Sequence, residues 1–105
     1  MNLVFKALSD PTRRRVLELL REGPMTAGDI AARFDVSKPT MSAHFAVLRE
    51  AGLVRSDREG KSLVYQLRLS VLEDALLSFA QAFGWDLRTA PLSDAGAIAE
   101  REPAG

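Results

Sequence analysis

The chain has 105 residues, the length of one small domain, with 47% hydrophobic and 27% charged residues. It contains no cysteine and one histidine. This excludes a disulfide framework, a thiolate nucleophile, a thiol sensor and a metal site built on cysteines or a histidine pair. No apolar run reaches the length of a membrane span and the N-terminus lacks a signal pattern, so we expect a cytoplasmic protein without membrane insertion.

Charge is distributed unevenly along a chain whose formal net charge is +0. Residues 1–68 carry twelve Lys and Arg against eight Asp and Glu, whereas residues 69–105 carry two against six. This asymmetry is typical of a protein whose basic part meets a polyanion, although a scatter of solvated charges explains it equally well. The positions of the individual charges must decide between the two.

Two helices are predicted first. Residues 3–8 form an almost wholly apolar helix candidate in which Lys6 is the only charge. A second helix begins at Asp10-Pro11, because Asp accepts hydrogen bonds at an N-cap and Pro loses none at the first helical position. Gly23-Pro24 ends this helix. Its apolar stripe consists of Val16, Leu17 and Leu20.

A helix-turn-helix comes next. Thr26, with Asp29 three positions on, opens a short third helix as a capping-box variant. Ser37 is the N-cap of a fourth helix, which runs to about Ala51 and ends at Gly52. We expect three or four residues between the two helices, which is the connection typical of a helix-turn-helix.

Two strand-like runs and a last helix complete the order. Residues 53–57 and 62–69 are rich in Leu, Val and Tyr, and Gly60 between them favours a hairpin loop. The segment Ser70–Glu73 is a capping box for a fifth helix that extends to about Phe83.

This order of elements predicts a winged helix-turn-helix, a mainly α fold with a small β-hairpin (α+β, order α-α-α-α-β-β-α). We assign residues 1–85 to this domain. From position 86 the composition shifts to Ala, Pro, Ser, Gly and acids, so residues 86–105 are predicted to form a mobile C-terminal tail.

The fourth helix has two different faces on a helical wheel. One is a narrow apolar stripe of Met41, Phe45 and Leu48, which we expect to face the core. The other is small and polar, so that its backbone fits closely into a major groove and its hydroxyls meet either donor or acceptor base edges. The alternative is a solvent-facing helix whose small residues have no function. The candidate DNA-binding residues here are Lys38, Pro39, Thr40, Ser42 and Ala43.

His44 lies at the rim of the apolar stripe and is also a DNA-binding candidate. We favour a positioning role, through a hydrogen bond to a neighbouring backbone group or to a DNA phosphate, over direct reading of a base. A catalytic role has no support, because no Ser–His–Asp or Cys–His set can be assembled around this residue.

The predicted hairpin carries three cations, Arg55, Arg58 and Lys61. A cationic wing lies along a phosphate strand or enters the minor groove, so these residues join the DNA-binding candidates. The alternative is that hairpin tips are polar for solubility, which is the better account of Glu59. The run Arg13–Arg15 is weaker evidence, and we expect its Arg14 to pair with Glu18.

The fifth helix carries an apolar stripe at i, i+4, i+7 and i+11, formed by Leu72, Leu76, Phe79 and Phe83. Such a stripe could simply be core, but the first helix is also apolar nearly all round and a small domain has few interior places for both. We therefore expect the first and last helices to form a two-fold dimer interface that includes Leu3, Val4 and Phe5. Two-fold symmetry sets two recognition helices about 34 Å apart, the spacing of half-sites in an inverted repeat.

Five segments together follow a family pattern: Phe5–Arg14, Met25–Ala31, Ser37–Phe45, Ala51–Val54 and Gly60–Tyr65. They resemble the ArsR/SmtB winged helix-turn-helix repressors over about residues 2–83, and most of all the SdpR-like autorepressor branch. The resemblance implies an autoregulatory homodimeric repressor without enzymatic activity, in which the small polar face of the fourth helix meets the operator. Many relatives have a larger polar residue where Ala43 stands, which implies one direct base contact fewer here.

Metal sensing is the best-known use of that family. It requires Cys in or near the third helix, or Asp/His and His/Glu pairs in the fifth helix. This chain has no Cys, and its fifth helix contains Glu73 and Asp74 but no His. The metal-sensor and persulfide-sensor hypotheses therefore fail residue by residue, and we expect no metal and no cofactor.

The sequence thus predicts a homodimeric repressor that binds double-stranded DNA at an inverted-repeat operator. One alternative is a winged-helix module that docks a protein partner, and another is a repressor released by an unidentified small ligand or protein partner. The polar face of the fourth helix and the cations beside it favour DNA. An enzyme is the function class that the sequence supports least, because the chain has neither a Gly-rich phosphate loop nor a carboxylate pair at a plausible cleft.

Overall fold

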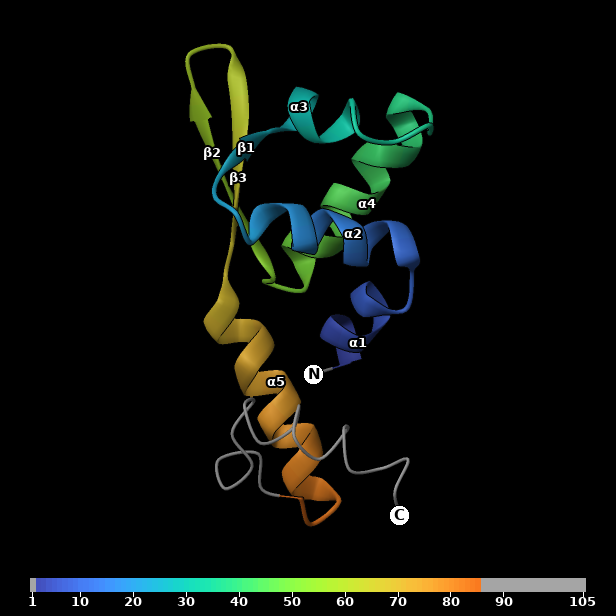
Figure 1. Ribbon diagram of the computed structural model, residues 1–105, viewed down its shortest axis with the longest axis vertical. Coiled ribbons are helices and arrows are strands. Elements are labelled where there is room, and N and C mark those ends of the chain that lie inside the picture. The colour runs from blue at the N-terminus through green and yellow to red at the C-terminus, as the bar shows by residue number, and fades with distance from the viewer. Residues whose placement is uncertain (1, 86–105) are drawn as a thin grey trace, which may run out of the picture. The chain divides into compact units, whose positions relative to one another are not determined.

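The computed structural model describes residues 2–85, and the predicted tail, residues 86–105, lies outside them. The described residues divide into two units, one before and one after the boundary between Leu72 and Glu73. The first unit holds the helix-turn-helix and the sheet (Figure 1), and the second holds the greater part of the last helix. The elements in chain order are α1 (Asn2–Leu8), α2 (Pro11–Leu20), β1 (Met25–Thr26), α3 (Ala27–Ala31), α4 (Lys38–Glu50), β2 (Val54–Glu59), β3 (Ser62–Leu67) and α5 (Leu69–Ala82).

The predicted winged helix-turn-helix is confirmed, with one strand more than the sequence indicated. β1 pairs antiparallel with β3, in the register Met25 to Tyr65 and Thr26 to Val64. Together with the hairpin this gives a three-stranded sheet in the order β1-β3-β2. A strand of two residues has no pattern of its own, and it exists only because β3 supplies its hydrogen-bond partners.

Local capping begins α2 as predicted. A side-chain oxygen of Asp10 accepts hydrogen bonds from the backbone N–H groups of Thr12 at 2.8 Å and Arg13 at 3.2 Å. These two donors would otherwise have no partner in the first turn of the helix. The predicted apolar stripe of α2, namely Val16, Leu17 and Leu20, is buried.

Both helices of the helix-turn-helix also begin at their predicted caps. The hydroxyl of Thr26 accepts from the N–H of Asp29 at 3.0 Å, and that of Ser37 accepts from the N–H of Thr40 at 3.3 Å. The connection is longer than predicted, because α3 ends at Ala31 and residues 32–37 join it to α4. The chain leaves α3 through tight turns with hydrogen bonds between residues three apart.

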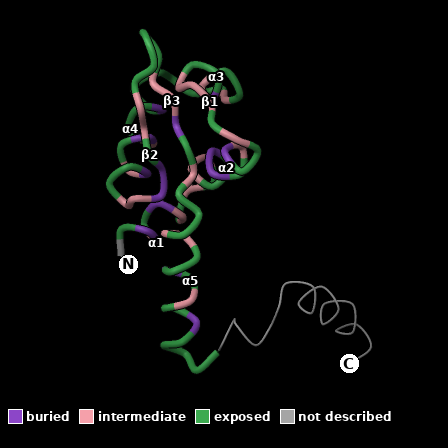
Figure 2. The backbone as a smooth tube through the Cα atoms, turned by 90° about the vertical axis from the view of Figure 1, so that its left-hand side faces the viewer, coloured by how far each residue is buried: buried purple, intermediate pink, exposed green. Residues whose placement is uncertain are grey.

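The hairpin of β2 and β3, called the wing below, is also tighter than predicted. β2 continues to Glu59, which pairs with Ser62, so Arg58 and Glu59 belong to the strand and the loop is Gly60-Lys61. Gly60 has a φ of +63°, the left-handed conformation that a two-residue hairpin loop requires. The tip of the wing extends beyond α3 in both views (Figures 1 and 2).

The start of α5 differs from the prediction. The helix begins at Leu69, so Ser70 lies inside it and is not the N-cap. Arg68 alone separates β3 from α5, and its N–H donates to the carbonyl of Leu53 at 2.9 Å. The C-terminal end is as predicted, because Gly84 has a φ of +79° and the N–H of Trp85 donates to the carbonyl of Ala80.

The hydrophobic core of the first unit lies where α4 and the sheet meet. The ring of Phe45 on α4 stacks on that of Tyr65 on β3, with centroids 4.6 Å apart. The apolar stripe of α4 is therefore inside, as predicted, and the buried segments of Figure 2 follow it. Further core residues include Val16, Leu17, Leu20, Ile30, Leu53 and Val54.

Candidate nucleic-acid interface

The outer face of α4 is fully presented to solvent. Its inner stripe is held by the core, so helical geometry forces the opposite side chains outward. The hydroxyl of Ser37 donates to that of Thr40 at 2.9 Å, which orders the first turn. All five candidates of this face, Lys38, Pro39, Thr40, Ser42 and Ala43, are exposed. The face is thus small, polar and accessible along the first half of the helix.

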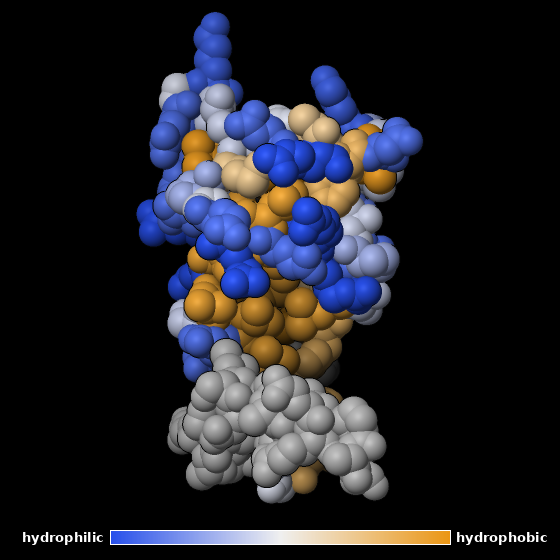
Figure 3. All heavy atoms as spheres, viewed as in Figure 1, coloured by the Kyte–Doolittle hydropathy of each residue, from blue (hydrophilic) through white to orange (hydrophobic). Residues whose placement is uncertain are grey.

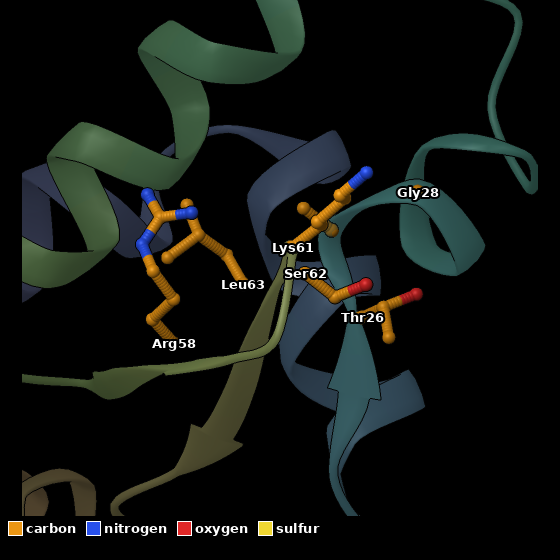
Figure 4. A pocket seen from close by; sticks show the side chains of 7 residues that line it. Thr26, Gly28, Arg58, Lys61, Ser62 and Leu63 are labelled. Atoms are coloured by element: carbon orange, nitrogen blue, oxygen red, sulfur yellow. The ribbon is translucent and has the colours of Figure 1, made fainter.

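The wing and the start of α3 line an open groove with a volume of about 430 Å³. Lys61 extends from the hairpin loop toward Gly28, and the hydroxyls of Thr26 and Ser62 lie nearby (Figure 4). Arg58, from β2, lines the same groove. Two predicted DNA-binding cations therefore share a hollow with two hydroxyl groups, which suits an anionic chain such as a phosphate backbone.

Arg55 is placed differently from the other two cations of the wing. Its Nε lies 3.0 Å from Oδ2 of Asp57, and both side chains are largely exposed. Residues two apart on a strand lie on the same face, so Asp57 offsets the charge of Arg55 where a phosphate would meet it. The alternation of Arg and Asp at i and i+2 was a signal in the sequence that our prediction did not use.

Removing this offset should strengthen DNA binding. We expect Asp57→Asn to raise the affinity for duplex DNA about twofold to fivefold at low salt, because an exposed ion pair is worth about 0.5–1 kcal/mol. A fluorescence anisotropy titration measures this change. Asp74→Asn, an exposed residue of α5, removes the same charge elsewhere and should leave the affinity within about 1.5-fold. Equal gains from both variants would mean that net charge alone is responsible.

The arginine run forms partnerships other than the predicted one. Arg15, not Arg14, pairs with Glu18, at 3.0 Å between Nη1 and Oε1. Arg14 instead donates to the carbonyl of Leu8 at 2.7 Å. Arg13 donates to carbonyls in the last turn of α1. The carbonyls at the end of a helix lack partners within that helix, so they accept hydrogen bonds from Arg13 and Arg14. For this reason Arg14 does not pair with Glu18.

His44 lies at the inner edge of the outer face of α4, with 15% of its side chain exposed. Its Nδ1 is 3.1 Å from Nη1 of Arg13, and its Nε2 is 3.9 Å from Oδ2 of Asp10. The partner within the protein is thus a guanidinium, where we predicted a backbone group or a DNA phosphate. Neither Arg13 nor Asp10 was a site candidate, because their proximity to His44 depends on how α2 packs against α4.

Asp10 has a pKa below its ordinary value of 3.8. Partial burial raises this pKa, but the backbone N–H groups of Arg13 and Thr12 lower it, as do the charges of His44 and Arg13, and the lowering prevails. A carboxyl whose pKa is lowered by folding stabilises the folded state at pH values above its ordinary pKa. That stabilisation is lost as the pH falls through the lower folded-state value.

The C-terminal half of α5 exposes large apolar side chains. Leu76 is 41% exposed and Phe83 is 75% exposed, and Phe79 packs on Phe83 with ring centroids 4.9 Å apart. With Ala80 and Trp85 these residues line an apolar groove of about 350 Å³. Four of the five groove residues are therefore exposed, which is unusual for side chains of this size.

The other predicted dimer residues differ in exposure. Leu3 is exposed, whereas Phe5 and Leu72 are half-buried. Val4 retains only 6% of its surface, so it has little area left to give to an interface. On the face drawn in Figure 3, hydrophilic side chains project at the wing and where α3 meets α4.

Residues 2–85 lack two further classes of site. No three His, Asp or Glu side chains of this segment are grouped so that they could hold a metal ion. None of its helices combines the length and the apolar composition needed to span a bilayer.

Comparison with known proteins identifies the family. A family model described as a helix-turn-helix domain matches residues 8–57. The transcriptional repressor SdpR of Bacillus subtilis is 50% identical over 72% of this chain and 84% of its own length. The biofilm growth-associated repressor of Agrobacterium fabrum is 37% identical over 62% of this chain, which spans only 56% of that relative. The crystal structure of an ArsR family transcriptional regulator matches with a TM-score of 0.73 and 30% identity, over 79% of this chain and 91% of that one. The chain therefore belongs to the ArsR family of helix-turn-helix transcriptional regulators, which are DNA-binding proteins and not enzymes.

Proposed function

We propose that the protein is a homodimeric repressor that binds an inverted-repeat operator and regulates its own gene. The observation that carries this proposal is the outer face of α4. It is exposed, small and polar along its first half, while the other side of the same helix is locked into the core. A helix held in this way enters a major groove without rearranging. The relative SdpR, itself a repressor by name, supports the same output.

Each element of the interface has a part in the proposal. Ser42 and Thr40 meet base edges, Lys38 meets a guanine edge or a phosphate, and Ala43 lets the backbone approach closely. Arg58 and Lys61, in the groove beside α3, follow the phosphate backbone. Bound at a promoter, the protein blocks access of the polymerase. A repressor of this kind acts where the promoter lies, which in bacteria is the cytoplasm.

The dimer follows from the exposed apolar side chains of α5. A second copy covers Leu76, Phe79 and Phe83, and Leu3 adds apolar area from α1. Two protomers related by a two-fold axis present two copies of α4 to successive major grooves. The proposal includes no thiol sensor, since the chain has no cysteine, and it assigns release to no metal. A small ligand or a protein partner is then the releasing signal, if there is one.

A titration against the DNA upstream of the protein's own gene, with scrambled DNA as competitor, tests the proposal. We expect specific binding in the nanomolar range that weakens steeply with salt. Ser42→Ala removes one contact from each half-site and should lower operator affinity about 5- to 30-fold per half-site, since a base contact contributes about 1–2 kcal/mol. Lys38→Ala should reduce the magnitude of the log–log salt slope by about 2 if the Lys38 of each protomer meets a phosphate.

Arg21→Ala is the matched control for Lys38→Ala. Arg21 is an exposed cation at the end of α2 that belongs to neither the outer face of α4 nor the wing. Its removal should leave operator affinity within about twofold. If the unmodified protein prefers no promoter fragment over scrambled DNA, the proposal fails and a winged-helix module that docks a protein becomes the better account.

A further inference from the structure

Arg13 joins α1, α2 and α4 through a single side chain. From α2, its Nε donates to the carbonyl of Ala7 at 2.8 Å and its Nη2 donates to the carbonyl of Lys6 at 2.9 Å. Its Nη1 lies 3.1 Å from Nδ1 of His44 on α4. One planar guanidinium thus holds the last turn of α1 on one side and the recognition helix on the other.

The chemistry of the pair fixes the direction of its hydrogen bond. Arg13 has only donors, so Nδ1 of His44 must accept. In the neutral ring the proton then sits on Nε2, which is the nitrogen that faces Oδ2 of Asp10 at 3.9 Å. Asp10 is itself held by backbone N–H groups at the start of α2. Both ring nitrogens therefore face groups that belong to the same end of one helix.

The hydrogen bond between Arg13 and His44 fixes the rotation of α4 about its own axis more sharply than apolar packing does. Hydrophobic burial of Met41, Phe45 and Leu48 holds α4 against the core, but the hydrophobic effect is non-directional, whereas a hydrogen bond depends on the angle between its donor and acceptor. His44 follows Ala43 directly, between the buried stripe and the outer face. A hydrogen bond there sets the rotation of α4, and with it the direction in which Ser42 points.

We propose that Arg13 is a positioning residue for DNA recognition, which acts through His44 to fix the rotation of α4 against α1 and α2. The inference rests on the proposed function, because it concerns how the outer face of α4 is aimed at an operator. Arg13 and His44 contribute to the discrimination of operator from other DNA without touching the bases. His44 is then a support of the recognition helix and not a member of its reading face.

A double-mutant cycle tests this link. The variants are Arg13→Met, which keeps the aliphatic stem, His44→Leu, which removes the acceptor, and the two combined. We expect each single variant to lower operator affinity about 5- to 20-fold and the double variant to be no more than about twofold worse than either. Affinity for scrambled DNA should change less than twofold. Additive losses would overturn the inference, because His44 would then contact DNA independently of Arg13.

Arg14→Met is the matched control. Arg14 also donates to a carbonyl at the end of α1, that of Leu8, and carries the same charge, but this hydrogen bond joins α2 to α1 and does not involve α4. We expect operator affinity within about twofold of the unmodified protein. Equal losses in Arg13→Met and Arg14→Met would assign the effect to the end of α1 and overturn a role through His44.

A conservative rescue and a spectroscopic readout complete the test. His44→Asn places an acceptor oxygen the same number of bonds from the backbone as Nδ1, so it should bind the operator within about twofold of the unmodified protein, whereas His44→Leu should not. This comparison remains informative if Arg13→Met fails to fold. His44 is the one histidine of the chain. Its ¹⁵N NMR signals should show that Nδ1 accepts a hydrogen bond, and the Nδ1 signal should shift to that of an acceptor without a hydrogen bond in Arg13→Met.

The NMR measurement needs no DNA, which separates the two hypotheses. If the unmodified protein shows no operator preference but the Nδ1 signature is present, the proposed function fails while the link between Arg13 and His44 stands. If operator binding is specific and the signature is absent, or if His44→Asn binds as weakly as His44→Leu, the positioning role is wrong.

Discussion

Leu76→Glu should convert the protein into a monomer and lower its operator affinity by a factor on the order of 100 or more. Leu76 lies in the apolar groove of α5 with 41% of its surface exposed, so the substitution is tolerated by a single chain. At a dimer interface it places two uncompensated carboxylates in an apolar contact, which is strongly unfavourable. A monomer presents one recognition helix and loses the effective concentration that the second gains from the first, a factor of about 10² to 10⁴.

Sedimentation equilibrium measures the oligomeric state, and a titration with operator DNA measures the affinity. Ser78→Glu is the control, because Ser78 is exposed on the opposite side of α5 from the Leu76 stripe. The control should remain dimeric and bind DNA within about threefold of the unmodified protein. A Leu76→Glu protein that is still a dimer would show that the subunits associate through another surface.

Phe45→Ala should lower the free energy of unfolding by about 3–5 kcal/mol, the usual cost of removing a buried aromatic side chain. Phe45 is 6% exposed and stacks on Tyr65, so its loss opens a cavity between α4 and β3. A domain of this size is stabilised by about 5–15 kcal/mol in total, so the variant should be partly unfolded at moderate temperature. Urea denaturation at a fixed protein concentration measures the effect, since dimerisation makes stability depend on concentration.

Ser42→Ala is the matched comparison on the outer face of the same helix. Its stability should stay within about 0.5 kcal/mol of the unmodified protein, because Ser42 is exposed and surface substitutions change stability little. Its operator affinity should nevertheless fall. A Phe45→Ala protein as stable as Ser42→Ala would contradict the assignment of the α4 stripe to the core. Together the two variants separate the face of α4 that holds the fold from the face that meets DNA.

Much of the fold was determined by the sequence alone, because its signals are local. Asp10, Thr26 and Ser37 begin their helices by accepting hydrogen bonds from N–H groups two or three residues ahead, whatever surrounds them. Gly60 turns the wing because a left-handed residue is required there. The helical period of 3.6 residues per turn places the apolar residues of α4 on one side and its small polar residues on the other. The order of these elements sufficed to predict the winged helix and the exposed candidates on α4.

Only the tertiary structure decided where long polar side chains find their partners. Arg13, Arg14 and Arg15 are equivalent neighbours in the sequence, yet Arg13 donates to α1 and contacts His44, Arg14 donates to the carbonyl of Leu8, and Arg15 pairs with Glu18. The existence of β1 depended in the same way on β3. An arginine has five donors on a flexible stem, so its choice among acceptors is made by the groups that packing brings within reach, often from distant parts of the chain. Short-range hydrogen bonds and helical periodicity can be predicted from the order of residues, whereas contacts between α2 and α4 exist only once the helices have packed.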